Sequence, residues 1–146
     1  MTQSSHIEEL FSTMIQLGKL MSQNTQETRE QKMATMLQFS ALHFLSENPE
    51  VAMSELGEKL KLSKSSATQL IERLVKAGLV KREEDREDRR IMRLTITNKG
   101  KRQGEILKEK IITRMGKIFS KIPENDIKEL IRIHHNLINT LKLDTQ

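Results

Sequence analysis

The chain has 146 residues, of which 36% are hydrophobic and 31% charged, a balance that suits one soluble folded domain. Only 3% of the residues are aromatic, so the apolar content comes from aliphatic side chains and methionine, which mostly favour or tolerate helices. The absence of cysteine excludes disulfides, thiolate metal sites and cysteine redox switches. No leader-like pattern opens the sequence and no uncharged apolar stretch reaches membrane-spanning length, so we expect a cytoplasmic protein without a membrane segment.

Positive charge is concentrated in the middle of the chain. Residues 58–102 hold 14 basic and 7 acidic side chains, a net charge of +7, whereas the rest of the chain has a net charge of −2. Such a concentration is typical of a surface that binds a polyanion, and nucleic acid is the commonest one. A solvated charged surface without a partner is the alternative, so charge alone does not define the function.

The N-terminal third predicts two helices. From Ile7 to Met21, apolar residues recur at the spacing of a helix with a broad apolar face. The polar residues 22–31 predict a connection. Residues 33–45 then predict a helix that is apolar nearly all round, and therefore buried, and that stops before Asn48-Pro49.

Two helix starts follow each other closely in the next segment. Ser54 is placed to cap a short helix, and Ser63 is placed to cap a longer one that Gly78 ends. The longer helix has an apolar stripe, formed by Ala67, Leu70, Ile71, Leu74 and Val75. Its opposite face carries hydroxyl, amide and charged groups, from Lys64, Ser65, Ser66, Thr68, Gln69, Glu72, Arg73 and Lys76.

After this helix the spacing becomes that of strands. Residues 79–83 and 91–96 predict two short strands, and the wholly polar residues 84–90 predict a solvated hairpin loop between them. Thr97 is placed to cap a long helix that runs to about Lys121.

Pro123 is placed to begin a last helix. Together, the predicted helices and the hairpin give a fold that is mainly α with a small β-hairpin wing. The order of short helix, tight turn, capped helix and charged hairpin is that of a winged helix-turn-helix. In this fold one helix enters the major groove of DNA, and the hairpin reaches the adjacent backbone or minor groove.

At this point the sequence resembles the MarR family of bacterial and archaeal regulators, over essentially the whole chain. The matching segments are residues 37–42, 54–60, 63–81, 85–90 and 94–100. The wing motif of the family, Asp-x-x-Asp-x-Arg, matches Asp85, Asp88 and Arg90, and its Leu-Thr-x-x-Gly pattern matches Ile96, Thr97 and Gly100. The departures are Arg86, where proline is common, and Ile96 in place of leucine.

The resemblance implies one MarR-like domain over residues 1–146, with 33–100 as the winged DNA-binding region. Helices in residues 6–31 and 104–146 would interlock two copies into a homodimer. The apolar faces of these helices support pairing independently, because a monomer would expose them to water. The resemblance also implies that Arg90 enters the minor groove and that Asp88 holds the wing through an arginine, for which we expect Arg73.

We expect the DNA contacts to come from the recognition helix and the wing. The recognition-helix candidates are Ser63, Lys64, Ser65, Ser66, Thr68, Gln69 and Arg73. The wing candidates are Arg86, Arg89 and Arg90, with Asp85 and Asp88 as the residues that structure the wing. The alternative for the wing is that its arginines only solvate a hairpin.

Members of the family bind small, often aromatic and anionic effectors, and the resemblance implies a pocket lined by Met14, Met36, Phe39 and His43. The lack of cysteine argues against regulation by thiol oxidation. The adjacent pair His134-His135 would point about 100° apart on a helix, so a shared metal ion is not expected. We therefore expect no metal and no cofactor.

These patterns predict a sequence-specific double-stranded DNA-binding transcriptional regulator. In the commoner mode of the family it would be a repressor that binds a pseudo-palindromic operator as a homodimer and is released by a small effector. An enzyme is not expected, because no nucleophile setting, catalytic histidine or glycine-rich phosphate loop lies near the acidic pairs. The alternative is a winged-helix protein-interaction module without DNA binding, in which replacing Arg90 would leave the function unchanged.

Overall fold

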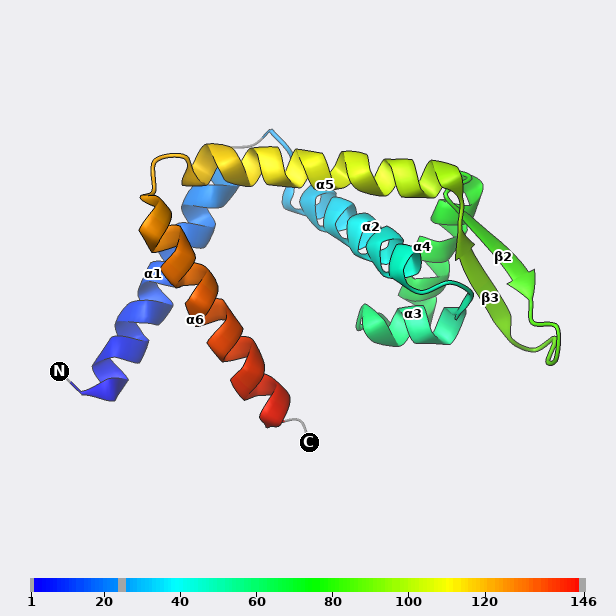
Figure 1. Ribbon diagram of the computed structural model, residues 1–146, viewed down its shortest axis with the longest axis horizontal. Coiled ribbons are helices and arrows are strands. Elements are labelled where there is room, and N and C mark those ends of the chain that lie inside the picture. The colour runs from blue at the N-terminus through cyan, green and yellow to red at the C-terminus, as the bar shows by residue number, and fades with distance from the viewer. Residues whose placement is uncertain (1, 24–25, 145–146) are drawn as a thin grey trace. The chain divides into compact units, whose positions relative to one another are not determined.

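The computed structural model describes residues 2–23 and 26–144, which form six helices and three short strands (Figure 1). Their order is α1 (Gln3–Gln23), α2 (Arg29–Glu47), β1 (Val51–Ala52), α3 (Met53–Lys59), α4 (Lys64–Lys76), β2 (Val80–Glu84), β3 (Met92–Ile96), α5 (Asn98–Phe119) and α6 (Glu124–Leu143). The predicted fold class, mainly α with a β-hairpin wing, is confirmed. The chain forms two compact units, the first ending at Glu109 and the second beginning at Lys110.

Helix α2 begins earlier than its apolar pattern predicts, because a capping box fixes its start. The Thr28 hydroxyl oxygen accepts from the Gln31 backbone N–H, and the Gln31 side chain accepts from the Thr28 backbone N–H. The predicted connection over residues 22–31 is therefore shorter, and its residues 24 and 25 lie outside the described part of the chain.

Burial along α2 is confined to its C-terminal half. Ala41, Leu42 and Leu45 are buried, whereas Met33 and Met36 are 59% and 48% exposed. The prediction of a helix buried along its whole length is thus wrong for the first half, which finds no covering element among the described residues of this chain.

The start of α3 also differs from the prediction. Its N-cap is Ala52, without a side-chain cap, and Ser54 lies inside the helix rather than before it. The reason is that Val51 and Ala52 form a short strand, β1, which pairs with Leu94 and Arg93 of β3 and passes directly into the helix. The resulting sheet is antiparallel with the order β1-β3-β2.

The hydrophobic core of the first unit lies between α2, α3, α4 and the sheet. Its most buried large side chains are Leu42, Leu45, Leu56, Ile71 and Leu94, each at most 1% exposed. Full burial of one such side chain is worth about 1.5–3 kcal/mol. Because α4 contributes Ala67, Leu70, Ile71 and Leu74 to the buried set, the core fixes which face of α4 points to solvent.

The end of α4 and the start of α5 are joined by hydrogen bonds around Gly78. Gly78 has φ of 72°, and the Gly78 and Leu79 N–H groups donate to the carbonyls of Val75 and Leu74, which makes a Schellman cap. The Thr97 hydroxyl accepts from the Gly100 N–H and donates to the Gly78 carbonyl, at 3.0 and 2.7 Å. The predicted caps at Gly78 and Thr97 are confirmed.

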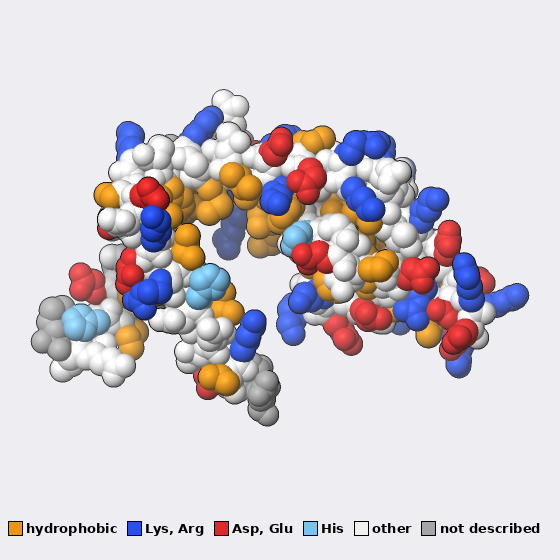
Figure 2. Space-filling model, in the orientation of Figure 1, with side chains coloured by type: hydrophobic (Ala, Val, Ile, Leu, Met, Phe, Trp, Pro, Cys, Tyr) orange, Lys and Arg blue, Asp and Glu red, His pale blue; other side chains and the backbone are white. Residues whose placement is uncertain are grey.

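The terminal helices expose their apolar faces. No described residue of α1 or α6 is buried, and Phe11 and Leu137 are 65% and 56% exposed. Hydrophobic side chains lie open at the surface of these helices in Figure 2. Soluble monomers rarely leave apolar surface of this extent uncovered.

Candidate nucleic-acid interface

The recognition helix α4 begins where the sequence predicts. The Ser63 hydroxyl oxygen accepts from the Ser66 N–H at 3.1 Å and donates to the Ser66 hydroxyl at 2.9 Å. The remaining free N–H groups of the first turn, together with the exposed Lys64, give this helix end a positive potential.

The solvent face of α4 is polar along its length. At about 100° per residue, Ser65, Gln69, Glu72 and Lys76 lie opposite the buried stripe, and all four are exposed. The Thr68 hydroxyl, toward one side of this face, donates to the Lys64 carbonyl at 2.9 Å. Of the predicted contact residues of α4, Ser65 and Gln69 lie on this outward line, and Glu72 and Lys76 belong to it although they were not predicted as contacts.

A hollow connects α4 to the wing hairpin formed by β2, β3 and residues 85–91. It measures about 590 Å³, and its walls include Lys64 and Thr68 of α4 and Arg90 of the wing. Its floor is apolar, with Ala67, Ile71 and Met92 among the lining side chains. The fold thus brings three of the predicted contact residues to one concave surface. Ser63, Ser65, Arg86 and Arg89 are exposed but do not line it.

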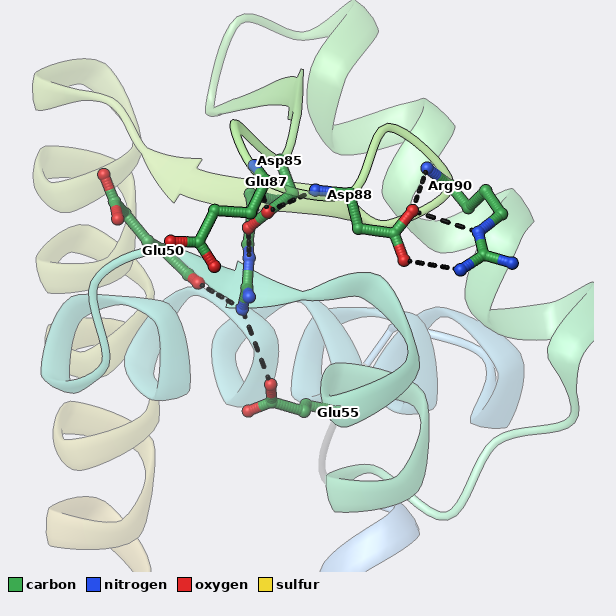
Figure 3. Close-up of polar contacts among 7 residues, drawn as sticks. Glu50, Glu55, Asp85, Glu87, Asp88 and Arg90 are labelled. Carbon is green, nitrogen blue, oxygen red and sulfur yellow. Dashed lines mark hydrogen bonds and ion pairs between the residues drawn. The ribbon is translucent and has the colours of Figure 1, made fainter.

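Asp85 organises the turn of the wing. One carboxylate oxygen accepts from the backbone N–H groups of Glu87 and Asp88, at 2.9 and 3.0 Å, and the other accepts from Arg93 Nε at 2.7 Å (Figure 3). The hydrogen bond from Arg93, followed by those from the two N–H groups, lowers the pKa of Asp85 from 3.8 to about 2. These hydrogen bonds support the predicted role of Asp85 in structuring the wing.

Asp88 holds Arg90 in a bidentate ion pair. Arg90 Nε and Nη2 each lie 3.0 Å from a carboxylate oxygen of Asp88, and the Arg90 N–H also donates to Asp88 (Figure 3). These bonds lower the pKa of Asp88 below its ordinary value. The expected pair between Asp88 and Arg73 is wrong, because a partner two residues away in the same turn captures the carboxylate. Arg73 forms no ion pair within the part of the chain that the structure describes.

The ion pair leaves Arg90 available to a ligand. Its side chain is 90% exposed, so the guanidinium is oriented by Asp88 but open to solvent on its outer side. An oriented arginine loses less side-chain freedom when it binds than a free one does. The wing therefore presents a preorganised cation.

Arg93 is a wing residue that the sequence did not single out. Besides Asp85, it contacts the Glu50 carbonyl oxygen through Nη1 at 3.3 Å, and the same Nη1 lies 3.8 Å from Glu55 of α3. The strand alternation predicts only that Arg93 points away from Leu94, and gives no indication of partners 38 or more residues earlier. Arg93 links the wing turn to the chain that leads into α3.

The predicted effector residues are only partly brought together. Phe39 and His43 stack with ring centroids 5.6 Å apart and line a groove of about 300 Å³, together with Lys101 and Lys108 of α5. Met14 and Met36 do not line this groove and are largely exposed.

The described residues show neither a metal-binding cluster nor a membrane-spanning helix. Within residues 2–23 and 26–144, no group of three or more His, Cys, Asp or Glu side chains is arranged to hold a metal ion. Over the same residues, no helix is both long and apolar enough to cross a membrane.

The fold and the surface of α4 and the hairpin define a winged helix-turn-helix protein. Known proteins agree: the model of the MarR family matches residues 34–91. The organic hydroperoxide resistance transcriptional regulator of Bacillus subtilis (strain 168) is 31% identical over 109 residues, covering 73% of this chain and 71% of that protein. The uncharacterized HTH-type transcriptional regulator YsmB of the same strain is 28% identical over 139 residues, covering 90% and 93%.

Solved structures show the same fold. The YusO protein from Bacillus subtilis superposes with a TM-score of 0.72 at 20% identity, covering 95% of this chain and 99% of that one. The chain belongs to the MarR family of transcriptional regulators, which are not enzymes. The predicted family and the prediction that the protein is not an enzyme are confirmed by these relatives.

Proposed function

We propose that this regulator is a repressor that binds a pseudo-palindromic operator in double-stranded DNA as a homodimer. The observation that carries the proposal is the shared hollow of α4 and the wing, where Lys64, Thr68 and Arg90 face one concave surface. A helix that enters the major groove and a wing arginine that enters the adjacent minor groove need this juxtaposition.

The proposed DNA contacts fall into two groups, those to base edges and those to phosphates. Ser65 and Gln69 are the outward hydrogen-bonding side chains in the N-terminal half of α4 and would read base edges. Lys64, Arg73, Arg86 and Arg89 are exposed cations that would neutralise phosphates. Ser63, Ser66 and Thr68 already make hydrogen bonds within α4, so their first role is to shape the helix.

The exposed apolar faces of the terminal helices support the proposed homodimer. Segments 6–31 and 104–146 would pair two copies, and both carry apolar side chains, such as Phe11 of α1 and Leu137 of α6, that no described residue of this chain covers. The segment 33–100 of each copy would then address one half of the operator. The two recognition helices must lie about 34 Å apart, one turn of DNA.

Release by a small aromatic anion is the regulatory part of the proposal. The stacked rings of Phe39 and His43 offer a flat surface. Lys101 and Lys108 line the same groove together with Glu105, so the positive charges there exceed the negative one. An anion bound there would contact α2 and the first half of α5. It would act by changing the separation of the recognition helices, and a structure with benzoate bound but unchanged helix spacing would contradict this.

The deciding experiment is a fluorescence-anisotropy titration of duplex DNA from upstream of the protein's own gene and of a scrambled duplex, at several salt concentrations. We expect preference for the native duplex and a steep salt dependence. Arg90→Ala removes the oriented cation of the wing and should weaken binding by tenfold or more, on the order of one lost specific contact in each copy.

Arg102→Ala is the matched control, because it removes the same charge from an exposed position of α5 that lies outside residues 33–100 and outside the segments 6–31 and 104–146. It should bind native duplex as the unaltered protein does. Equal, weak and mutation-insensitive binding to both duplexes, confirmed by a selection from random duplexes that enriches nothing, would favour the protein-interaction module instead.

A further inference from the structure

The face of α4 that points away from the core carries an unpaired carboxylate at its centre. Gln69, Glu72, Arg73 and Lys76 line one shallow hollow of about 330 Å³ on this face. Although Arg73 and Lys76 share the hollow, the Glu72 carboxylate forms no ion pair with any residue in the described part of the chain. It is exposed, so its acceptor oxygens are available to a ligand.

The negative charge of the Glu72 carboxylate repels the phosphates of DNA. Residues 58–102 carry a net charge of +7, and the carboxylate lies on the outermost line of the helix that would enter the groove. In the major groove, however, cytosine presents an N4 amino donor that a carboxylate accepts, whereas thymine presents an O4 acceptor that repels it. A carboxylate there therefore discriminates between bases, and it lowers affinity for every site without the donor.

Gln69 lies beside Glu72 on the same surface. Residues three apart on a helix have Cβ atoms about 5–6 Å apart, so these two side chains meet neighbouring base pairs. A glutamine amide pairs bidentately with adenine N6 and N7. The hydroxyls of Ser66 and Thr68, by contrast, are engaged with Ser63 and with the Lys64 carbonyl.

We propose that Glu72 is a specificity-determining residue that reads cytosine in each half-site of the operator, next to an adenine read by Gln69. This inference rests on the proposed function, because it requires that α4 enters the major groove. Arg73 and Lys76 then serve as the cations that offset the carboxylate near the backbone phosphates.

The test is a selection of random duplexes by the full-length protein and by Glu72→Ala, followed by anisotropy titrations. The unaltered protein should enrich a two-fold symmetric motif with cytosine at one position of each half. Changing that cytosine to thymine should weaken its binding about 5- to 150-fold per position. For Glu72→Ala the two bases should bind within about twofold of each other, and binding to scrambled duplex should become tighter at low salt.

Two further variants test whether the cytosine preference depends on Glu72 itself rather than on the removal of a negative charge, and whether the adenine preference depends on Gln69. Glu47→Ala removes the same charge from an exposed position near the end of α2, outside the dimerisation segments and the proposed DNA contacts, and should keep the cytosine preference. Gln69→Ala should lose the adenine preference and keep the cytosine preference. Circular dichroism melts should be unchanged for Glu72→Ala, since its side chain makes no ion pair within the described residues.

Failure of the inference on Glu72 and failure of the proposed function give different results. If the unaltered protein enriches a motif and Glu72→Ala enriches the same one with the same cytosine preference, the inference is wrong and the proposed function stands. If Glu72→Ala only tightens binding to all duplexes equally, Glu72 acts by charge alone, and the inference is again wrong. If the unaltered protein enriches nothing, the proposed function fails and the inference fails with it.

Discussion

Replacing Gly100 by alanine should destabilise the protein, although alanine is the better helix former. Gly100 lies in the first turn of α5, where the helix passes over the start of β2. A Cβ atom at this position would lie 2.1 Å from the Leu79 carbonyl oxygen and 2.8 Å from Ile96 Cγ1. Since the nearest obstacle is backbone, the start of α5 must move to make room.

The loss of folding stability depends on the hydrogen bonds that a movement of the start of α5 would disturb. The Thr97 N–H donates to the same Leu79 carbonyl at 3.0 Å, and the Thr97 hydroxyl donates to the Gly78 carbonyl at 2.7 Å. Overpacking costs about 1–3 kcal/mol, a lost hydrogen bond about 1 kcal/mol, and alanine regains about 1 kcal/mol over glycine in a helix. We expect a net loss of about 1–3 kcal/mol, which lowers Tm by about 2–12 °C.

The assay is urea unfolding followed by far-UV circular dichroism, with all proteins at one concentration because dimerisation would shift the transition. Gly104→Ala, one turn further along α5, is the control. Its added Cβ would meet Leu42 Cβ at 3.6 Å, an ordinary contact, so its stability should be unchanged or up to about 1 kcal/mol higher. Equal stability of Gly100→Ala and Gly104→Ala would refute the reasoning.

Three further outcomes are expected. The Asp85 carboxylate, whose pKa is lowered from 3.8 to about 2, stabilises the folded wing only while ionised. That contribution should be complete above about pH 4 and lost as the pH falls through 2, and a carbon NMR titration of Asp85 with a midpoint near 4 would contradict it. Ser63→Ala should cost about 0.5–2 kcal/mol in urea unfolding through loss of the α4 cap, whereas Ser65→Ala, which removes no cap, should change stability little. Leu137→Lys should shift sedimentation equilibrium from dimer toward monomer, because Leu137 is 56% exposed on the apolar face of α6; an unchanged dimer would exclude that face from the interface.

The sequence by itself determined the elements whose signals are local. The apolar stripe at helical spacing, Ser63 before it and Gly78 after it predict α4 within a residue of its observed bounds, because periodicity and caps depend on neighbours only a few positions apart. The alternation of residues 91–96 and the polar loop before them predict the wing for the same reason. The solvent face of α4, and with it the predicted base-reading side chains, follows from that periodicity.

Only the tertiary structure decided the features that join distant parts of the chain. Strand β1 is two residues long and exists because β3 offers it a partner more than 40 residues away. Arg93 has the Glu50 carbonyl and Glu55 as partners for the same reason. Such contacts depend on the relative positions of elements after packing, and residue spacing along the chain carries no information on that.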